Sequence, residues 1–119
     1  MTYRFYNANA HGNFVNDCTI RAISLAEGKS WDETYEELSK IAQNNGIILD
    51  DVRFIEPFLD SRYERQCYDE KYVGEFVEEH PNGTYLITMN GHITCAINGV
   101  IYDTFDCRDR VMWCAWEVL

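Results

Sequence analysis

The sequence predicts one α+β domain over residues 1–119, in which N-terminal helices pack on a C-terminal antiparallel β-sheet. Apolar residues recur at helical spacing between residues 18 and 79, whereas residues 84–118 are rich in β-branched and aromatic types. Helices and strands that occupy separate stretches of a chain are typical of the α+β class. A chain of 119 residues can bury one substantial core, and no repeat or linker divides it.

The first dozen residues look extended, and the first helix is predicted to begin near Cys18. Either Asn16 or Asp17 could cap its N-terminus, because short polar side chains accept hydrogen bonds from the free N–H groups of the first turn. The helix is expected to stop before Gly28, since glycine readily adopts the left-handed conformation that ends helices. Cys18 is therefore expected in the first turn of a helix.

Two further helical segments follow. Residues 30–33 form a capping box that opens the second helix, and Asn45-Gly46 is a natural stop for it. Residues 52–66 contain a proline within an apolar stretch, which predicts a short helix or an irregular piece. A third periodic pattern covers residues 70–79, with Tyr72 on its apolar face.

Four strands are predicted at residues 84–90, 93–97, 100–105 and 111–118. The dipeptide Asn98-Gly99 joins the second and third of them, and it is strongly favoured in two-residue hairpin turns. The predicted sheet is therefore antiparallel, and the turn fixes the register of its central hairpin.

The register of this hairpin places Thr94 opposite Asp103. His92 and Asp103 then become diagonal neighbours on one face, roughly 7–8 Å apart at the backbone and within reach of each other's side chains. Asp106 falls on the opposite face in this register, so Asp103 is the better partner for His92. The alternative is that Asp103 is a strand carboxylate that meets solvent at the sheet edge.

The charge balance excludes some classes of partner. Acidic residues outnumber basic ones by 20 to 10, which gives a net charge of −10. Sites for nucleic acid or anionic membranes need clustered Lys and Arg, so neither partner is expected. No apolar run approaches the roughly 20 residues of a membrane span, and the first residues lack the pattern of a signal peptide. A cytoplasmic protein is the expectation.

The five cysteines are an odd number in a chain without a signal-peptide pattern, which disfavours a disulfide framework. Free thiols in a reducing compartment are therefore expected, most of them buried as small apolar residues. Cys18 differs from the others because the unpaired N–H groups and the dipole at a helix N-terminus favour a thiolate. Asp17 would oppose this if its carboxylate pointed at the sulfur. The alternative is that Cys18 simply faces the core.

A nucleophilic thiolate needs a base, and the chain has three histidines. His80 lies at an exposed helix end and His11 in a polar loop, whereas His92 opens a predicted strand. Cys18, His92 and Asp103 can thus supply a nucleophile, a general base and a residue that orients the imidazole. The alternative for His92 is a plain strand-end histidine.

An oxyanion in such a site needs hydrogen-bond donors. The backbone N–H of Cys18 is one candidate, and a side-chain amide from the preceding loop is another. Asn13 and Asn16 are the amides available there. Asn13 is the weakly preferred choice, because it leaves Asn16 free to cap the helix.

These residues resemble the papain-like cysteine peptidase superfamily, in which a cysteine opens a helix and a histidine and an Asp or Asn follow on strands. The matching segments are residues 16–23, 91–94 and 100–104. The overall pattern is similar to small peptidase-like proteins of bacteria and their phages. The run Cys18-x-x-Arg21-Ala22 also resembles the cysteine motif of ovarian-tumour-type deubiquitinases. Papain-like enzymes often have a glutamine six positions before the cysteine, where this chain has a glycine.

The resemblance implies a papain-like hydrolase, a peptidase or isopeptidase that cleaves an amide bond of a protein or peptide substrate through a thioester intermediate. Two alternatives stay open. One is a non-catalytic module with this fold, for example a phage-encoded inhibitor of a host factor, which the absent glutamine would favour. The other is an acyltransferase, in which an amine captures the acyl group. The sequence does not specify an oligomeric state.

No cofactor or metal is expected. A zinc site made of His92, Cys95, Cys107 and Cys114 would lack any C-x-x-C pair. In the predicted hairpin, Cys95 also lies on the face opposite His92, which counts further against such a site.

Overall fold

The computed structural model describes residues 2–49 and 52–118 and shows an α+β fold. In this part of the chain, four helices accompany a six-stranded mixed sheet. The helices are α1 (Cys18–Glu27), α2 (Trp31–Asn44), α3 (Val52–Arg62) and α4 (Val73–Glu79). The strands are β1 (Tyr3–Phe5), β2 (Arg65–Cys67), β3 (Thr84–Met89), β4 (His92–Ile97), β5 (Val100–Asp103) and β6 (Met112–Val118).

The strand order across the sheet is β1-β5-β4-β3-β6-β2. The pairs between β3, β4, β5 and β6 are antiparallel, as predicted, and β2 adds an antiparallel edge strand to β6. The prediction of a purely antiparallel, C-terminal sheet is nevertheless wrong, because β1 pairs with β5 in parallel. A strand of three residues is too short to show a hydrophobic period, so sequence patterning could not reveal either edge.

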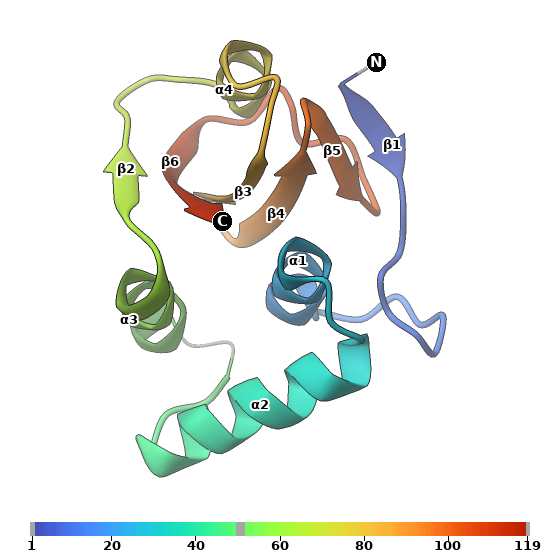
Figure 1. Cartoon of the computed structure of the whole chain (residues 1–119), viewed down its shortest axis with the longest axis vertical. Helices are drawn as coiled ribbons and strands as arrows, with labels where there is room; N and C mark the ends of the chain where they lie inside the picture. The colour runs from blue at the N-terminus through green and yellow to red at the C-terminus, as the bar shows by residue number, and fades with distance from the viewer. Residues whose placement is uncertain (1, 50–51, 119) are drawn as a thin grey trace.

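The sheet separates two layers of helices (Figure 1). Helices α1, α2 and α3 lie on one face and α4 lies on the other. The larger core cluster includes Ile23, Leu38, Leu59 and Trp116, and the smaller one surrounds Phe76 beneath α4. Helix α1 packs across β4, so its first turn comes close to the start of that strand.

The predicted hairpin register is confirmed. Ile97 pairs with Val100, and Asn98 and Gly99 both have positive φ angles of 49° and 80°. Two positive φ angles are what a type I′ turn requires, and this turn matches the twist of the flanking strands. The register carries Thr94 to a position where its hydroxyl reaches Asp103.

The helix predictions hold in part. Helix α1 begins at Cys18 and ends before Gly28, but the Asp17 side chain makes no capping hydrogen bond. Residues 52–62 are a regular helix despite Pro57, since the helix buries an apolar face that outweighs the missing hydrogen bond. Tyr72 lies at the N-cap of α4 and is exposed, so its predicted place on the buried face is wrong.

The capping box of α2 is confirmed and supports a stability prediction. Ser30 Oγ accepts a hydrogen bond of 3.0 Å from the Glu33 N–H, and Glu33 Oε1 accepts one of 3.2 Å from the Ser30 N–H. We expect Ser30→Ala to lower the free energy of unfolding by about 1 kcal/mol, because the Glu33 N–H at the helix start loses its acceptor and the reciprocal capping box is broken. Urea unfolding measures this loss. The control Ser39→Ala lies within the same helix and should cause no loss, since alanine favours helix; equal losses would contradict the prediction.

The expectation that all five cysteines are free is wrong. Cys67 and Cys114 lie directly opposite each other on β2 and β6 and form a disulfide, with their Cα atoms 4.1 Å apart. Counting cysteines cannot reveal such a pair, because it depends on the register of an edge strand. The argument from free thiols to a reducing compartment therefore fails for these two residues.

Among the described residues, no helix combines the length and the apolar character needed to cross a membrane.

Candidate active site

The structure brings together the three residues that the sequence singled out. Cys18 is the first residue of α1, His92 is the first residue of β4, and Asp103 is the last residue of β5. His92 Nε2 lies 2.7 Å from Asp103 Oδ2. The imidazole also interacts with the Cys18 thiol, and this interaction lowers the pKa of the thiol and raises the pKa of the imidazole. The three side chains therefore form a continuous Cys–His–Asp chain where the first turn of α1 meets the start of β4.

Asp103 is held firmly at the buried end of this chain. Its side chain is only 3 % exposed. Oδ2 accepts hydrogen bonds from His92 and, at 2.6 Å, from the Thr94 hydroxyl. Oδ1 accepts one of 2.7 Å from the Thr104 N–H and one of 3.0 Å from Arg21 Nη1. Four donors on two oxygens fix the carboxylate plane, so Asp103 can orient the His92 ring.

The charges of His92 and Asp103 stabilise each other. Burial alone would raise the pKa of Asp103, but hydrogen bonds from His92 and Thr94 lower it to about 2. Burial would lower the pKa of His92, but its hydrogen bonds to Asp103 and Cys18 raise it to about 9. At neutral pH the pair is therefore an imidazolium and a carboxylate.

The Cys18 thiol differs from the other free cysteines in its acidity. Burial favours the neutral thiol, but hydrogen bonds from His92 and the Ile93 backbone, with the positive charge of Arg21, bring its pKa below the ordinary value. Burial instead raises the pKa values of Cys95 and Cys107 to about 12. The surroundings of Cys18 thus favour a thiolate paired with the His92 imidazolium, as in an activated nucleophile.

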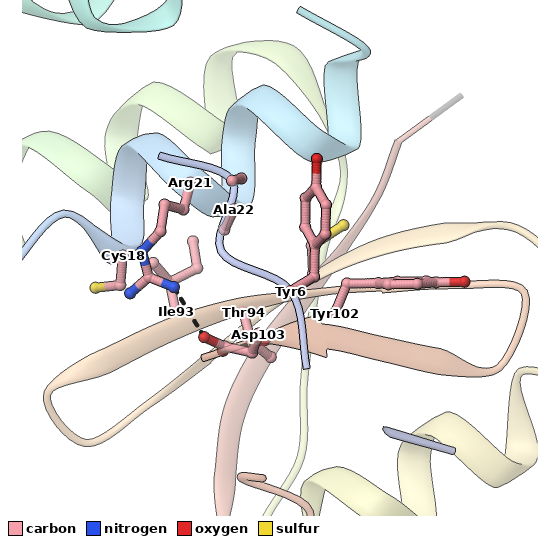
Figure 2. A pocket seen from close by; sticks show the side chains of 10 residues that line it. Tyr6, Cys18, Arg21, Ala22, Ile93, Thr94, Tyr102 and Asp103 are labelled. Atoms are coloured by element: carbon pink, nitrogen blue, oxygen red, sulfur yellow. Dashed lines mark hydrogen bonds and ion pairs between the residues drawn. The ribbon is translucent and has the colours of Figure 1, made fainter. Parts of the chain in front are cut away.

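Arg21 is a site residue whose role the sequence analysis missed. It lies one turn after Asp17 on α1, and its Nε donates to Asp17 Oδ1 at 2.7 Å while Nη1 donates to Asp103. Figure 2 shows Cys18 and Arg21 extending from the same end of α1, with the bond to Asp103 dashed. The i,i+4 spacing of Asp17 and Arg21 was the available signal. The hairpin partner of Arg21 could be found only from the tertiary structure.

The Asp17 carboxylate does not cap α1 as the sequence suggested, because its oxygens bind other side chains. Its Oδ2 accepts hydrogen bonds from Asn9 Nδ2 at 3.0 Å and from Trp31 Nε1 at 2.9 Å, and its other oxygen is bound by Arg21. Asp17 therefore does not cap α1 through its side chain, and its charge is neutralised rather than directed at the thiol.

Cys18 and His92 both line a groove of about 1030 Å³. Its volume lies at the upper end of the range of small-molecule binding sites. The Trp31 and Tyr35 rings stack at 5.3 Å on one side, and Tyr35 and Trp113 are each almost half exposed. The remaining wall comes from residues 15–20 and 55–57, Leu49, Arg65 and residues 88–93.

The two candidate amides for an oxyanion lie in different places. Asn13 is exposed, its backbone oxygen accepts a hydrogen bond from Asn7, and it does not line the groove. Asn16 does line the groove, beside Cys18. The assignment of Asn13 as the oxyanion residue stays a prediction, and the position of Asn16 makes it the nearer alternative.

One cluster has side chains that metals commonly use. Potential ligand atoms of His92, Asp103 and Cys107 lie within 4.8 Å of one another. However, all of the Asp103 oxygen positions are taken by hydrogen-bond donors, and one of these donors is the cationic Arg21. The pKa of Cys107 is also raised by burial, which opposes the thiolate form that metals need. The cluster fits a hydrogen-bonded chain better than a metal centre.

Comparisons with protein-family models, curated proteins and solved structures found no match to this chain. The arguments for a function therefore rest on the geometry of the groove and of the Cys–His–Asp chain.

Proposed function

We propose that this protein is a cysteine hydrolase of papain-like type that cleaves an amide bond of a peptide or protein substrate. The observation that carries the proposal is the arrangement of three residues: Cys18 and His92 line an open groove, His92 lowers the pKa of the Cys18 thiol, and Asp103 binds the His92 ring. In this reading Cys18 is the nucleophile, His92 is the general base and acid, and Asp103 orients the imidazole.

The orientation of the two His92 ring nitrogens supports this assignment. Asp103 accepts from Nε2, which leaves Nδ1 as the ring nitrogen for the sulfur. The Cys18 thiolate attacks the carbonyl carbon of the substrate, and the protonated His92 gives its proton to the leaving amine. A thioester forms between Cys18 and the acyl group. His92 then takes a proton from water, which attacks the thioester and releases the acid and the thiol.

The helix start contributes to the same step. Cys18 is the first residue of α1, where backbone N–H groups lack acceptors within the helix. Such donors can stabilise the oxyanion that forms when the thiolate attacks. The Asn16 amide, in the groove wall beside Cys18, is the side chain best situated to assist it.

The groove supports an extended polypeptide as the substrate. It is open, and the exposed aromatic side chains of Tyr35 and Trp113 offer apolar surface in the same groove as Cys18. The chain carries a net charge of −10, so a segment with basic residues outside the groove would be attracted to it.

Reaction with p-nitrophenyl acetate tests the proposal without knowledge of the natural substrate. Attack by Cys18 should release p-nitrophenolate in a burst close to one equivalent, and intact-mass and peptide mapping should locate an acetyl thioester on Cys18. Cys18→Ala should abolish the burst, whereas the matched control Cys107→Ala should keep it. A burst that persists without Cys18, or an acetyl group on other residues only, would contradict the proposal.

The same reaction separates the alternative functions. Slow release of acetate after the burst indicates hydrolysis, whereas acetyl glycinamide formed from added glycinamide indicates transfer to an amine. A protein that binds partners without turnover would show neither a burst nor a thioester.

A further inference from the structure

We propose that Arg21 is a positioning residue with two roles. It neutralises Asp17, which directly precedes the nucleophile Cys18, and it holds Asp103 in the orientation that His92 needs. This inference rests on the proposed function and deepens it. It adds to the His92–Asp103 pair two further ion pairs, from Arg21 to Asp17 and from Arg21 to Asp103.

The first part of the argument is geometric. Arg21 donates through Nε to Asp17 at 2.7 Å and through Nη1 to Asp103 at 3.0 Å, so one guanidinium spans a helix start and a strand end. The side chains of Arg21, Asp17 and Asp103 are 11 %, 5 % and 3 % exposed. A planar, rigid donor group suits such bridging, because its N–H bonds leave in fixed directions. Lysine could bind either carboxylate but could not reproduce both directions.

The second part of the argument is electrostatic. In the active form, three anionic groups lie close together: the Cys18 thiolate, Asp17 and Asp103. Among the described residues, Arg21 and the His92 imidazolium are the cations that pair with these carboxylates. Without Arg21, three negative charges would face one positive charge in a buried setting. Like charges disfavour ionisation, and the thiol is the group of the three that most readily keeps its proton.

Other ionisable groups near the site do not replace Arg21. Besides Asp17, His92 and Asp103, the ionisable side chains that line a cavity together with Cys18 or Arg21 are Cys95 of β4, Tyr102 of β5, Tyr6 before α1, Tyr35 of α2, Glu56 of α3 and Arg65 of β2. Asp32 on α2 is paired with His11, and Glu56 across the groove is paired with Arg65. Arg21 is therefore the arginine that counters both buried carboxylates.

The test is the pH profile of Cys18 alkylation by iodoacetamide, followed by peptide mapping. In Arg21→Met we expect the midpoint to rise by about one pH unit, because the unshielded carboxylates oppose the thiolate. In the double variant Asp17→Asn/Arg21→Met the midpoint should return toward that of the wild type. The rate of Cys18 alkylation at high pH should nevertheless stay below that of the wild type, since Asp103 has lost its hydrogen bond from Arg21. Arg21→Lys should fall between the wild type and Arg21→Met.

Two outcomes would overturn the inference. A purely structural role for Arg21 predicts that the variants lower the melting temperature while the Cys18 midpoint stays unchanged. If Arg21→Met does not fold, the variant Asp17→Asn provides the test. It should lower the midpoint of the Cys18 pH profile, because the charge of Arg21 would lose one of its two carboxylate partners. An unchanged midpoint would overturn the inference. A wild-type Cys18 that titrates as an ordinary thiol would instead contradict the proposed function itself.

Discussion

Replacing His92 by alanine is expected to slow the alkylation of Cys18 by iodoacetamide at pH 6 by about 100-fold or more. In the proposed site the wild-type thiol reacts as a thiolate that the His92 imidazolium stabilises, and the pKa of this imidazolium is raised to about 9. Without the ring, Cys18 loses the hydrogen bond that lowers its pKa, while the burial that raises it remains. A thiol with the ordinary value of 9.0 is ionised to only about one part in a thousand at pH 6.

The measurement is the second-order rate at Cys18, obtained from quenched samples by peptide mapping. His80→Ala is the matched control, because His80 lies at the end of α4 on the other face of the sheet and stacks on Phe76. It should leave the Cys18 rate unchanged. Equal rates for the wild type and His92→Ala would show that the imidazole does not activate the thiol.

Asp103→Asn is expected to destabilise the protein by about 3 kcal/mol near neutral pH, because it removes one partner from a buried ionic network. The Arg21 guanidinium and the His92 imidazolium would then share only Asp17 and the thiolate as counter-charges. Urea unfolding followed by circular dichroism measures the difference between the variant and the wild type.

The pH dependence of this difference has a definite sign. The folded pKa of Asp103 is lowered from 3.8 to about 2, so its contribution is complete above pH 3.8 and is lost as the pH falls through about 2. The folded pKa of His92 is raised from 6.5 to about 9, so its contribution is complete below pH 6.5 and is lost as the pH rises through about 9. The difference should be largest between about pH 4 and 6.5.

Asp106→Asn provides the control for this experiment. Asp106 pairs with Arg108 at the surface, where both side chains are about 40 % exposed, so its removal should cost little. A stability difference for Asp103→Asn that does not change between pH 2 and pH 10 would contradict the charge states described for the site.

The groove wall is connected to the charged residues around Cys18. Trp31 links the two, because its indole N–H binds Asp17 while its ring stacks on Tyr35 in the groove wall. Movement of the groove wall would therefore reach the carboxylate beside Cys18. The Arg21 bridge extends this connection to Asp103, so the groove wall and the charge network share one set of contacts.

The sequence by itself determined the local features of this protein. The capping box at Ser30 fixed the start of α2, and Asn98-Gly99 fixed the hairpin that brings His92 to Asp103. These features follow from short-range geometry, in which a turn type or a cap is set by a few neighbouring residues. The place of Cys18 at the start of α1 follows in the same way.

Only the tertiary structure decided the rest. The parallel pairing of β1, the Cys67–Cys114 disulfide and the bond from Arg21 to Asp103 each join residues more than 45 positions apart. Tyr35 and Trp113 fit the apolar pattern of a helix and a strand, yet they face a groove because no neighbouring element covers them. Periodicity reports which face of an element a residue occupies. What lies opposite that face depends on how distant segments pack, which local sequence does not encode.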